Sequence, residues 1–220
     1  MTSSEPEQQA KDLDDGMTGW RHMAFSEMKG LGDKVFAFAM TLLAYNLVVP
    51  DVSAGRLGDA LVAQIPQFAV FAISFAVAAN IWWQHHKLTR LFTGMEPLMV
   101  GLYFLFLGVV VLVPFAAALV GSYPYAQAAV LPFISLFIVL NGLCVLLTMR
   151  AERVGAWRYS INRGEYIWLL FNFIGGNLVL AIAFVLSLWN PMFGLVILAV
   201  GAVLGPILAP RSYRTYGGIE

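Results

Sequence analysis

The chain has 220 residues, of which 60% are hydrophobic and 12% are charged, and its formal net charge is zero. Soluble domains usually carry about 25% charged residues, so this composition excludes an ordinary soluble protein and favours one embedded in a membrane. We expect the lipid bilayer to surround most of the chain, and we expect no nucleic-acid partner.

Six apolar segments follow one another along the chain. Residues 97–149 and 166–210 contain no Asp, Glu, Lys or Arg, and each run is long enough for two membrane spans joined by a turn. Because every backbone polar group must be paired inside a bilayer, we expect all the spans to be helices. The expected spans are residues 33–49, 60–86, 97–120, 126–149, 165–188 and 192–209. The sequence therefore predicts an all-α integral membrane protein with six transmembrane helices.

The basic residues predict the orientation of these spans. All of them except Arg56 fall before or at the start of the first span, in the segments after the second and fourth, or after the sixth. Cytoplasmic loops carry the excess of Lys and Arg, so both termini are expected in the cytoplasm. We therefore expect a multi-pass protein of the cell (plasma) membrane. Its parts would be a disordered cytoplasmic tail (residues 1–19), a six-helix transmembrane domain (20–210) and a second cytoplasmic tail (211–220).

The first span carries the candidate pore residues. At helical spacing Phe38, Thr41, Tyr45 and Val48 fall on one face, and Asp33 stands at the start of the helix. A helix that faces only lipid is not expected to carry polar side chains on that face. Such a mixed face is typical of a helix that lines a pore or packs at the axis of an oligomer.

The second span ends in a cluster of aromatic and ionisable residues. Trp82, Trp83, His85 and His86 lie near its expected cytoplasmic end, at the same membrane depth as Asp33. We expect Asp33 to lie near one of the two histidines and one of the two tryptophans. Adjacent histidines point about 100° apart on a helix and do not chelate one ion together, which disfavours a metal site. The chain has no phosphate loop, nucleophile motif or dinucleotide fingerprint, so we expect no enzyme activity, no catalytic residue and no cofactor.

Three segments resemble a known family, the bacterial and endolysosomal potassium channels that lack a conventional selectivity filter. Members open with Arg-x-x-x-Phe-Ser-Asp, which runs into an apolar Val-Phe-Ala-x-Ala-x-Thr-Leu-Leu helix. The matching segments here are residues 33–43, residues 82–88 (Trp-Trp-Gln-His-His-Lys-Leu) and residues 112–121. The resemblance implies six spans with a cytoplasmic N-terminus, a homo-oligomer in the form of a tetramer, and K⁺ as the permeant ion.

The signature itself matches at two places. Arg21, Phe25, Ser26 and Glu27 reproduce its spacing, whereas residues 31–33 (Leu-Gly-Asp) occupy the expected position directly before the helix. Either an insertion, residues 28–33, separates the signature from its helix, or one copy is accidental. By the resemblance, the residues of the signature and gating region are Arg21, Phe25, Ser26, Glu27, Asp33, Trp82, His85 and His86.

The leading hypothesis is a potassium-selective or cation leak channel whose pore is lined by the first helix of each subunit. The resemblance places Thr41 at a pore position that the family also fills with Thr. Phe38 and Tyr45 replace aliphatic residues of the family, and Phe38 would form the narrowest point. The alternative is a non-conducting membrane scaffold or accessory protein of the same fold. A small-substrate transporter is disfavoured because no inverted repeat or broken helix is visible.

Overall fold

The computed structural model describes residues 5–208 except 46 and 160, and the side chains of residues 25–204 with the same two exceptions. The ordered segments among them are helices, apart from one isolated β-bridge between Phe92 and Trp157. The helices are α1 (Glu5–Tyr45), α2 (Leu57–Ala63), α3 (Ile65–Arg90), α4 (Pro97–Ser122), α5 (Gln127–Val154), α6 (Arg163–Ser187) and α7 (Pro191–Leu208), with a short 3-10 helix, η1 (Ala54–Arg56), before α2. The predicted all-helical membrane fold is confirmed.

Four helices, α3 to α6, are long and apolar enough to cross a bilayer, with mean hydropathies of 1.6, 2.6, 2.6 and 2.3. The part of α7 whose side chains are described, Pro191–Leu204, is a shorter apolar helix. The first predicted span, residues 33–49, corresponds to the C-terminal part of α1, which ends at Tyr45. The four central spans are therefore clear from length and composition, whereas α1 and α7 depart from a simple span.

The ends of several helices follow from local sequence. The predicted second span, residues 60–86, is divided between α2 and α3, because Pro66 in the first turn of α3 has no N–H to continue the helix from α2. Gly155 ends α5 in the left-handed conformation, with φ of 63°. Asn162 and Glu165 form a reciprocal capping box at the start of α6.

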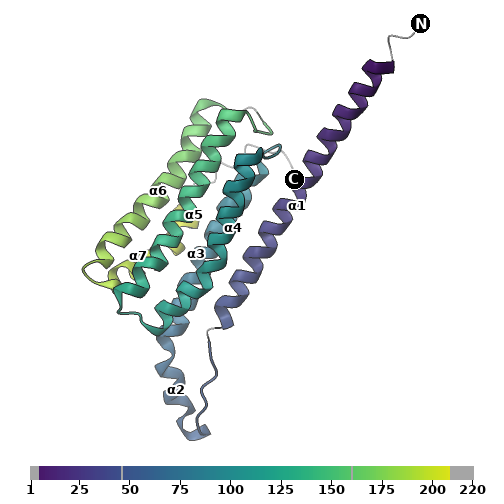
Figure 1. The fold of residues 1–220 in the computed structure, drawn as a ribbon. Coiled ribbons are helices and arrows are strands. Elements are labelled where there is room, and N and C mark those ends of the chain that lie inside the picture. Colours follow the sequence, from purple (N-terminus) through teal and green to yellow (C-terminus); the bar gives the residue numbers. More distant parts are fainter. Residues whose placement is uncertain (1–4, 46, 160, 209–220) are drawn as a thin grey trace.

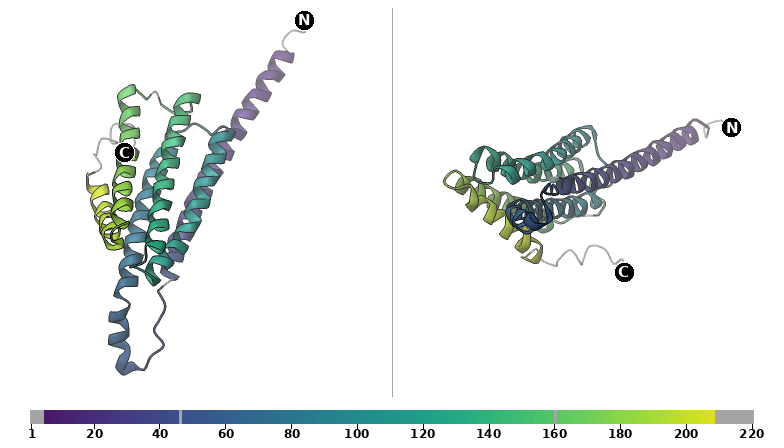
Figure 2. Two further views of the ribbon diagram at one scale, coloured as in Figure 1. Left: turned by 60° about the vertical axis from the view of Figure 1, so that its left-hand side comes forward. Right: turned by 90° about the horizontal axis from the view of Figure 1, so that it is seen from below.

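The helices form an antiparallel bundle in which α4, α5, α6 and α7 pack as successive neighbours (Figures 1 and 2). Its interior is rich in aromatic side chains, and Tyr103, Phe106, Phe133 and Phe137 are fully buried. Among the described elements, α1 packs only against α3 and α4. It thus lies at the edge of the bundle and leaves one side uncovered within a single chain.

The N-terminal part of α1 extends beyond the bundle (Figure 1). We expected residues 5–19 to form a disordered tail. In the structure they are part of α1, which begins at Glu5. The division of the chain at residues 19 and 210 stays a prediction. Residues 211–220, the second expected tail, lie outside the described residues.

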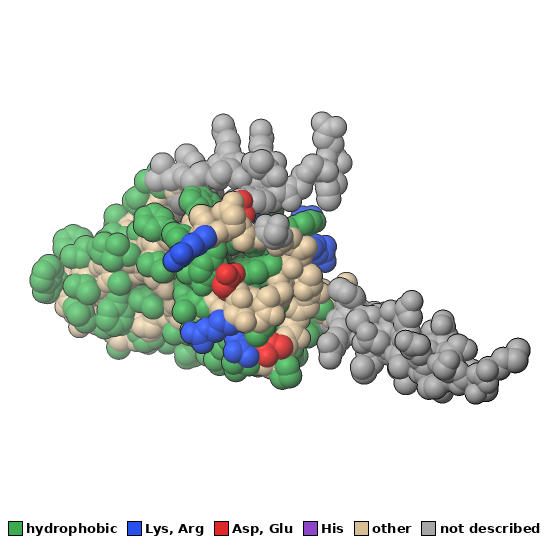
Figure 3. Space-filling model, turned by 90° about the horizontal axis from the view of Figure 1, so that it is seen from above, with side chains coloured by type: hydrophobic (Ala, Val, Ile, Leu, Met, Phe, Trp, Pro, Cys, Tyr) green, Lys and Arg blue, Asp and Glu red, His purple; other side chains and the backbone are tan. Residues whose placement is uncertain are grey.

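The α3–α4 and α5–α6 loops meet at one end of the bundle. The N–H of Thr93 donates to the carbonyl of Ala156 at 2.9 Å, and the N–H of Arg158 donates to the carbonyl of Leu91 at 2.7 Å. Lys, Arg, Asp and Glu side chains are visible at this end of the bundle in Figure 3, which views the molecule from above. Basic segments that are far apart in the sequence are therefore held together at one end.

Candidate functional site

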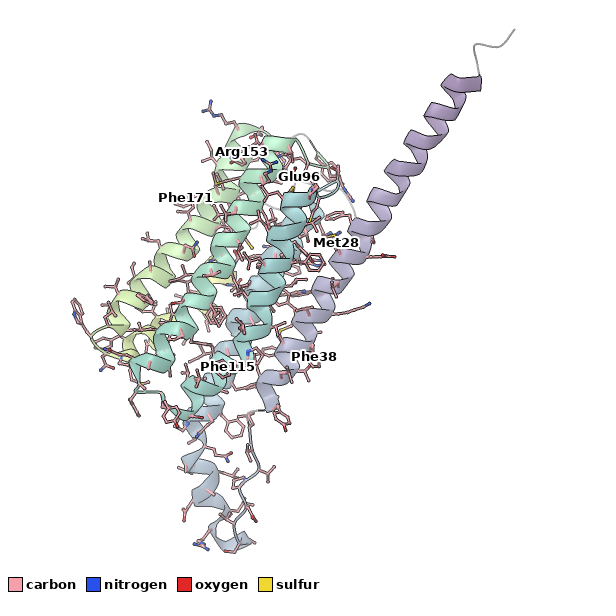
Figure 4. The ribbon with its side chains drawn as sticks, in the orientation of Figure 1. Met28, Phe38, Glu96, Phe115, Arg153 and Phe171 are labelled. Atoms are coloured by element: carbon pink, nitrogen blue, oxygen red, sulfur yellow. The ribbon has the colours of Figure 1, made fainter. Side chains whose placement is uncertain are left out.

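The membrane part of α1 has two faces of different character. Its buried face packs Phe36, Ala39 and Leu43 against the bundle. Its opposite face presents Phe38, 66% exposed, and Tyr45, 83% exposed, with Thr41 between them (Figure 4 labels Phe38). The sequence prediction placed these three residues on one helical face, and the described part of the chain leaves that face exposed.

Val48 differs from this pattern. It was predicted on the same helical face, but α1 ends at Tyr45 and residues 47–50 form no helix. Pro50 and the extended segment after it explain why a helical spacing does not continue. Val48 is exposed, yet its direction is not set by the α1 helix.

Asp33 ties the start of the membrane part of α1 to α3. Its Oδ1 accepts a hydrogen bond of 2.8 Å from Trp82 Nε1 and lies 3.4 Å from His86 Nδ1. Trp82 and His86 are one helical turn apart, and their rings lie 5.3 Å apart, so both reach the same carboxylate. The expected contact between Asp33 and this cluster is confirmed, and the members in contact are Trp82 and His86.

His85 occupies a different environment. Its side chain is buried, with 3% exposure, and its ring stacks on Phe106 with a centroid distance of 4.5 Å and an interplanar angle of 13°. Neither ring nitrogen has a hydrogen-bond partner among the described residues. His85 therefore packs as an aromatic ring, whereas His86 makes the polar contact with α1.

The described residues contain no group of three or more His, Cys, Asp or Glu side chains that could hold a metal ion. The polar groups of this region are instead the Asp33 carboxylate, the Trp82 indole and the His86 imidazole. Such a set can fix the position of a helix and can respond to protonation.

Comparison with known proteins relates part of the chain to one family of potassium channels. Residues 27–114 match the family described as endosomal/lysosomal potassium channel TMEM175. A potassium channel of Streptomyces collinus is 34% identical over 97 residues, which is 44% of this chain and less than half, 47%, of that protein. A potassium channel of Chamaesiphon minutus is 29% identical over 184 residues, which is 74% of this chain and 91% of that protein.

The chain is thus similar to the TMEM175 family, whose model its residues 27–114 match. Its fold is that of the crystal structure of a TMEM175 homologue from Chamaesiphon minutus, described as a lysosomal potassium-selective channel homologue. The TM-score is 0.75 at 23% sequence identity, covering 89% of this chain and all of that one. The resemblance stated from the sequence is confirmed, as is the prediction of an ion channel family rather than an enzyme.

The two copies of the TMEM175 signature contribute different residues to the structure. From the first copy, Phe25 is 5% exposed and joins the core, whereas Ser26 and Glu27 are exposed. The side chain of Arg21 lies outside the described residues. From the second copy, Asp33 makes the contacts with Trp82 and His86. Which copy corresponds to the signature in function stays a prediction.

One contact of this site was not predicted from the sequence. The hydroxyl of Tyr103 in α4 donates to the carbonyl of Met28 in α1 at 3.1 Å. A Cβ on Gly32 would lie 2.1 Å from that hydroxyl oxygen, so only glycine fits there without a shift. The signal available beforehand was a lone tyrosine hydroxyl in an apolar span and a glycine where the family has serine.

Proposed function

We propose that this protein forms a potassium-permeable pore lined by the uncovered face of α1 from each subunit of a homo-oligomer, a tetramer. The observation that carries the proposal is the mixed face of Phe38, Thr41 and Tyr45, which is exposed among the described residues. Its neighbour along the same face is Lys34, which is also exposed. A second copy of α1 would cover this face, and an axis of several copies would enclose a narrow channel.

The proposal includes six membrane crossings with both termini in the cytoplasm. Helices α3 to α6 supply four crossings, and α1 and α7 would supply the first and last. Residues 33–45 of α1 are helical, and that length of helix covers roughly 20 Å of a hydrocarbon core about 30 Å thick. The basic α3–α4 and α5–α6 loops would lie on the cytoplasmic side. The membrane we propose is the plasma membrane.

In this arrangement Phe38 forms a hydrophobic constriction. Dehydrated cations would pass it, while Asp33 near the cytoplasmic mouth would raise their local concentration. The bulk of four phenyl rings around one axis also supports the second candidate, a non-conducting scaffold of the same fold. The two candidates differ in whether the pore ever opens to ions.

Potassium flux from liposomes that contain the purified protein tests the proposal directly. Flux above that of protein-free liposomes, together with a tetrameric mass in detergent, is the expected result. If neither the wild-type protein nor Phe38→Ala conducts, and both assemble, the scaffold function is correct instead.

The orientation has its own test, because the natural cysteine, Cys144, is buried. A cysteine placed at Arg153 in intact cells should resist a membrane-impermeant thiol reagent, whereas one placed at Arg56 should react. Labelling of the Arg153 position from outside would refute the cytoplasmic placement of that end.

A further inference from the structure

Three basic residues from three different elements lie at the end of the bundle where the loops meet. They are Lys29 of α1, Arg90 at the end of α3, and Arg158 in the α5–α6 loop, and we call them the cationic cluster. The hydrogen bond from Arg158 N–H to the carbonyl of Leu91 places Arg158 beside the end of α3. The packing of Phe92 on Trp157, with centroids 5.5 Å apart, holds the two loops in that position.

No carboxylate among the described side chains forms an ion pair with a member of the cationic cluster. Among the described residues, the ion pairs within 4.0 Å are Arg150 with Glu96 and His86 with Asp33, and neither includes a member of the cluster. Partial burial lowers the pKa of Lys29, and the positive charges of Arg158 and Arg90 lower it further, against an opposite effect of Asp33. The charges of Arg158 and Arg90 thus act unfavourably on Lys29, and a bound anion would relieve that repulsion.

The surroundings of the cationic cluster place it at headgroup depth. Tyr159, next to Arg158, is half-exposed, and so is Trp83 on α3. Tyrosine and tryptophan side chains of this kind gather at membrane–water interfaces. Glu152, the nearby acid on α5, accepts a hydrogen bond of 2.7 Å from Trp157 Nε1. That carboxylate is therefore engaged in holding the loop.

We propose that the cationic cluster binds the phosphate of an anionic phospholipid headgroup. Guanidinium and ammonium groups from different helices can donate to several phosphate oxygens at once, which a headgroup at this depth would present. Basic pockets between transmembrane helices on the cytoplasmic side are suited to such headgroups. The proposal rests on the cytoplasmic placement of this end and does not require that the protein conduct ions.

Native mass spectrometry of the full-length protein in detergent, with added phosphatidylglycerol or phosphatidylcholine, tests this binding. The wild-type protein should retain phosphatidylglycerol in preference to phosphatidylcholine. The variant Lys29→Gln/Arg90→Gln/Arg158→Gln should bind phosphatidylglycerol more weakly by roughly fivefold per charge removed, or about a hundredfold in all. Because this readout is binding and not flux, its failure is distinguishable from failure of the pore proposal.

Matched variants separate a specific site from general charge. Arg153→Gln/Arg163→Gln removes two exposed charges from the same end but outside the cluster, and it should keep the wild-type preference. Lys29→Arg/Arg90→Lys/Arg158→Lys keeps the charges and should also bind. The single variant Arg158→Gln, which changes only a loop residue, replaces the triple variant if the latter does not fold.

Three results would overturn the proposal. One is unchanged phosphatidylglycerol binding in the folded neutral variant. Another is an equal loss in the Arg153→Gln/Arg163→Gln control, which would mean that overall charge alone attracts the lipid. The third is displacement of phosphatidylglycerol by an equal concentration of inorganic phosphate, which would assign the cluster to free phosphate.

Discussion

Two helices at the edges of the bundle, α1 and α6, each expose side chains at helical spacing, but the side chains differ in polarity. On α6 the exposed side chains include Ile167, Phe171 and Leu178, all apolar, with Phe171 72% exposed. On α1 the corresponding face carries Lys34, Phe38, Thr41 and Tyr45. Figure 4 labels Phe171 and Phe38 on these two helices.

The difference shows why exposure alone does not identify a pore face. The α6 face matches the hydrocarbon of a bilayer at every turn, so contact with lipid explains it fully. The α1 face alternates a charged, an aromatic, a hydroxyl and a phenol side chain at the same positions of the helical repeat. Since a lipid-facing helix gains nothing from that alternation, we assign the α6 face to lipid and propose the α1 face for the oligomer axis.

The largest expected effect comes from truncating the same side chain on the two faces. Phe38→Ala should widen the constriction and raise potassium flux by about tenfold or more, which corresponds to a barrier lower by roughly 1.4 kcal/mol. Phe171→Ala removes an equally exposed ring from the α6 face and should leave flux unchanged. Both variants are compared in liposomes at equal protein density.

Equal flux in both variants, with the same oligomeric mass, would remove the distinction between the two faces. A rise with Phe171→Ala alone would place the axis at α6 instead. Loss of the oligomer in Phe38→Ala would still assign the α1 face to contact between subunits, without a pore.

The next effect concerns the buried edge of α1, where Gly32 meets the Tyr103 hydroxyl. Gly32→Ala places a methyl group against that oxygen and should destabilise the protein by about 1–3 kcal/mol, the usual cost of overpacking. Gly30→Ala, two residues earlier, has no atom within 4 Å of its added Cβ. It should be neutral or stabilising, because alanine favours a helix more than glycine does. Unfolding in detergent measures both.

The reason given for this effect can itself be tested. If the clash is with the hydroxyl, Gly32→Ala in a Tyr103→Phe background should cost less than it does alone. An undiminished cost there would mean that backbone freedom, and not Tyr103, requires glycine at this position.

A smaller effect is expected at the contact between α1 and α3. Asp33→Asn keeps an oxygen that can accept from Trp82 Nε1 but removes the charge that faces His86. If this contact gates the pore, the variant should flatten the pH dependence of flux between about pH 5 and 8, where imidazole titrates. His86→Gln should flatten it similarly. An unaltered pH response in Asp33→Asn would exclude Asp33 from gating.

The sequence predicted the contact between Asp33 and the second span, but not its exact members. Hairpin topology alone places the start of α1 and the end of α3 at one depth. Adjacent residues on α3 differ by about 100° in direction, so the rotation of α3 decides between His85 and His86. That rotation depends on packing, here the stack of His85 on Phe106, which no local pattern encodes.

The ends of the first span were also beyond the sequence pattern. Charge-free runs located the α4–α5 and α6–α7 hairpins, because a bilayer requires such runs. The predicted first span continued to residue 49, past the end of α1 at Tyr45, because residues 47–49 are apolar as well. The division between α2 and α3 had a visible cause in Pro66, whereas the fit of Gly32 to Tyr103 needs the packed helices.

The smallest effect contrasts the Asp33 contact with the other ion pair at this end, Glu96 with Arg150. The hydrogen bond from Arg150 lowers the pKa of Glu96 below its ordinary value of 4.5, and this outweighs the opposing effect of partial burial. A carboxyl whose pKa is lowered in the folded protein stabilises it above the unfolded value. That stabilisation is lost as the pH falls from about 4.5 through the lowered pKa.

Glu96→Gln should therefore lower the unfolding temperature slightly at about pH 6 and shrink the further drop on acidification below about pH 4.5. In an Arg150→Gln background the same change should have no added effect, because the partner is gone. Asp59→Asn, at an exposed carboxylate in α2, should leave the acid profile as in the wild type. Since Glu96 joins α4 to α5 and does not touch α1, its variant should also leave the pH dependence of flux between about pH 5 and 8 unchanged. If Glu96→Gln flattened that flux profile as strongly as Asp33→Asn, the pH response would belong to this end of the bundle as a whole, and the separate role of the α1 contact would fail.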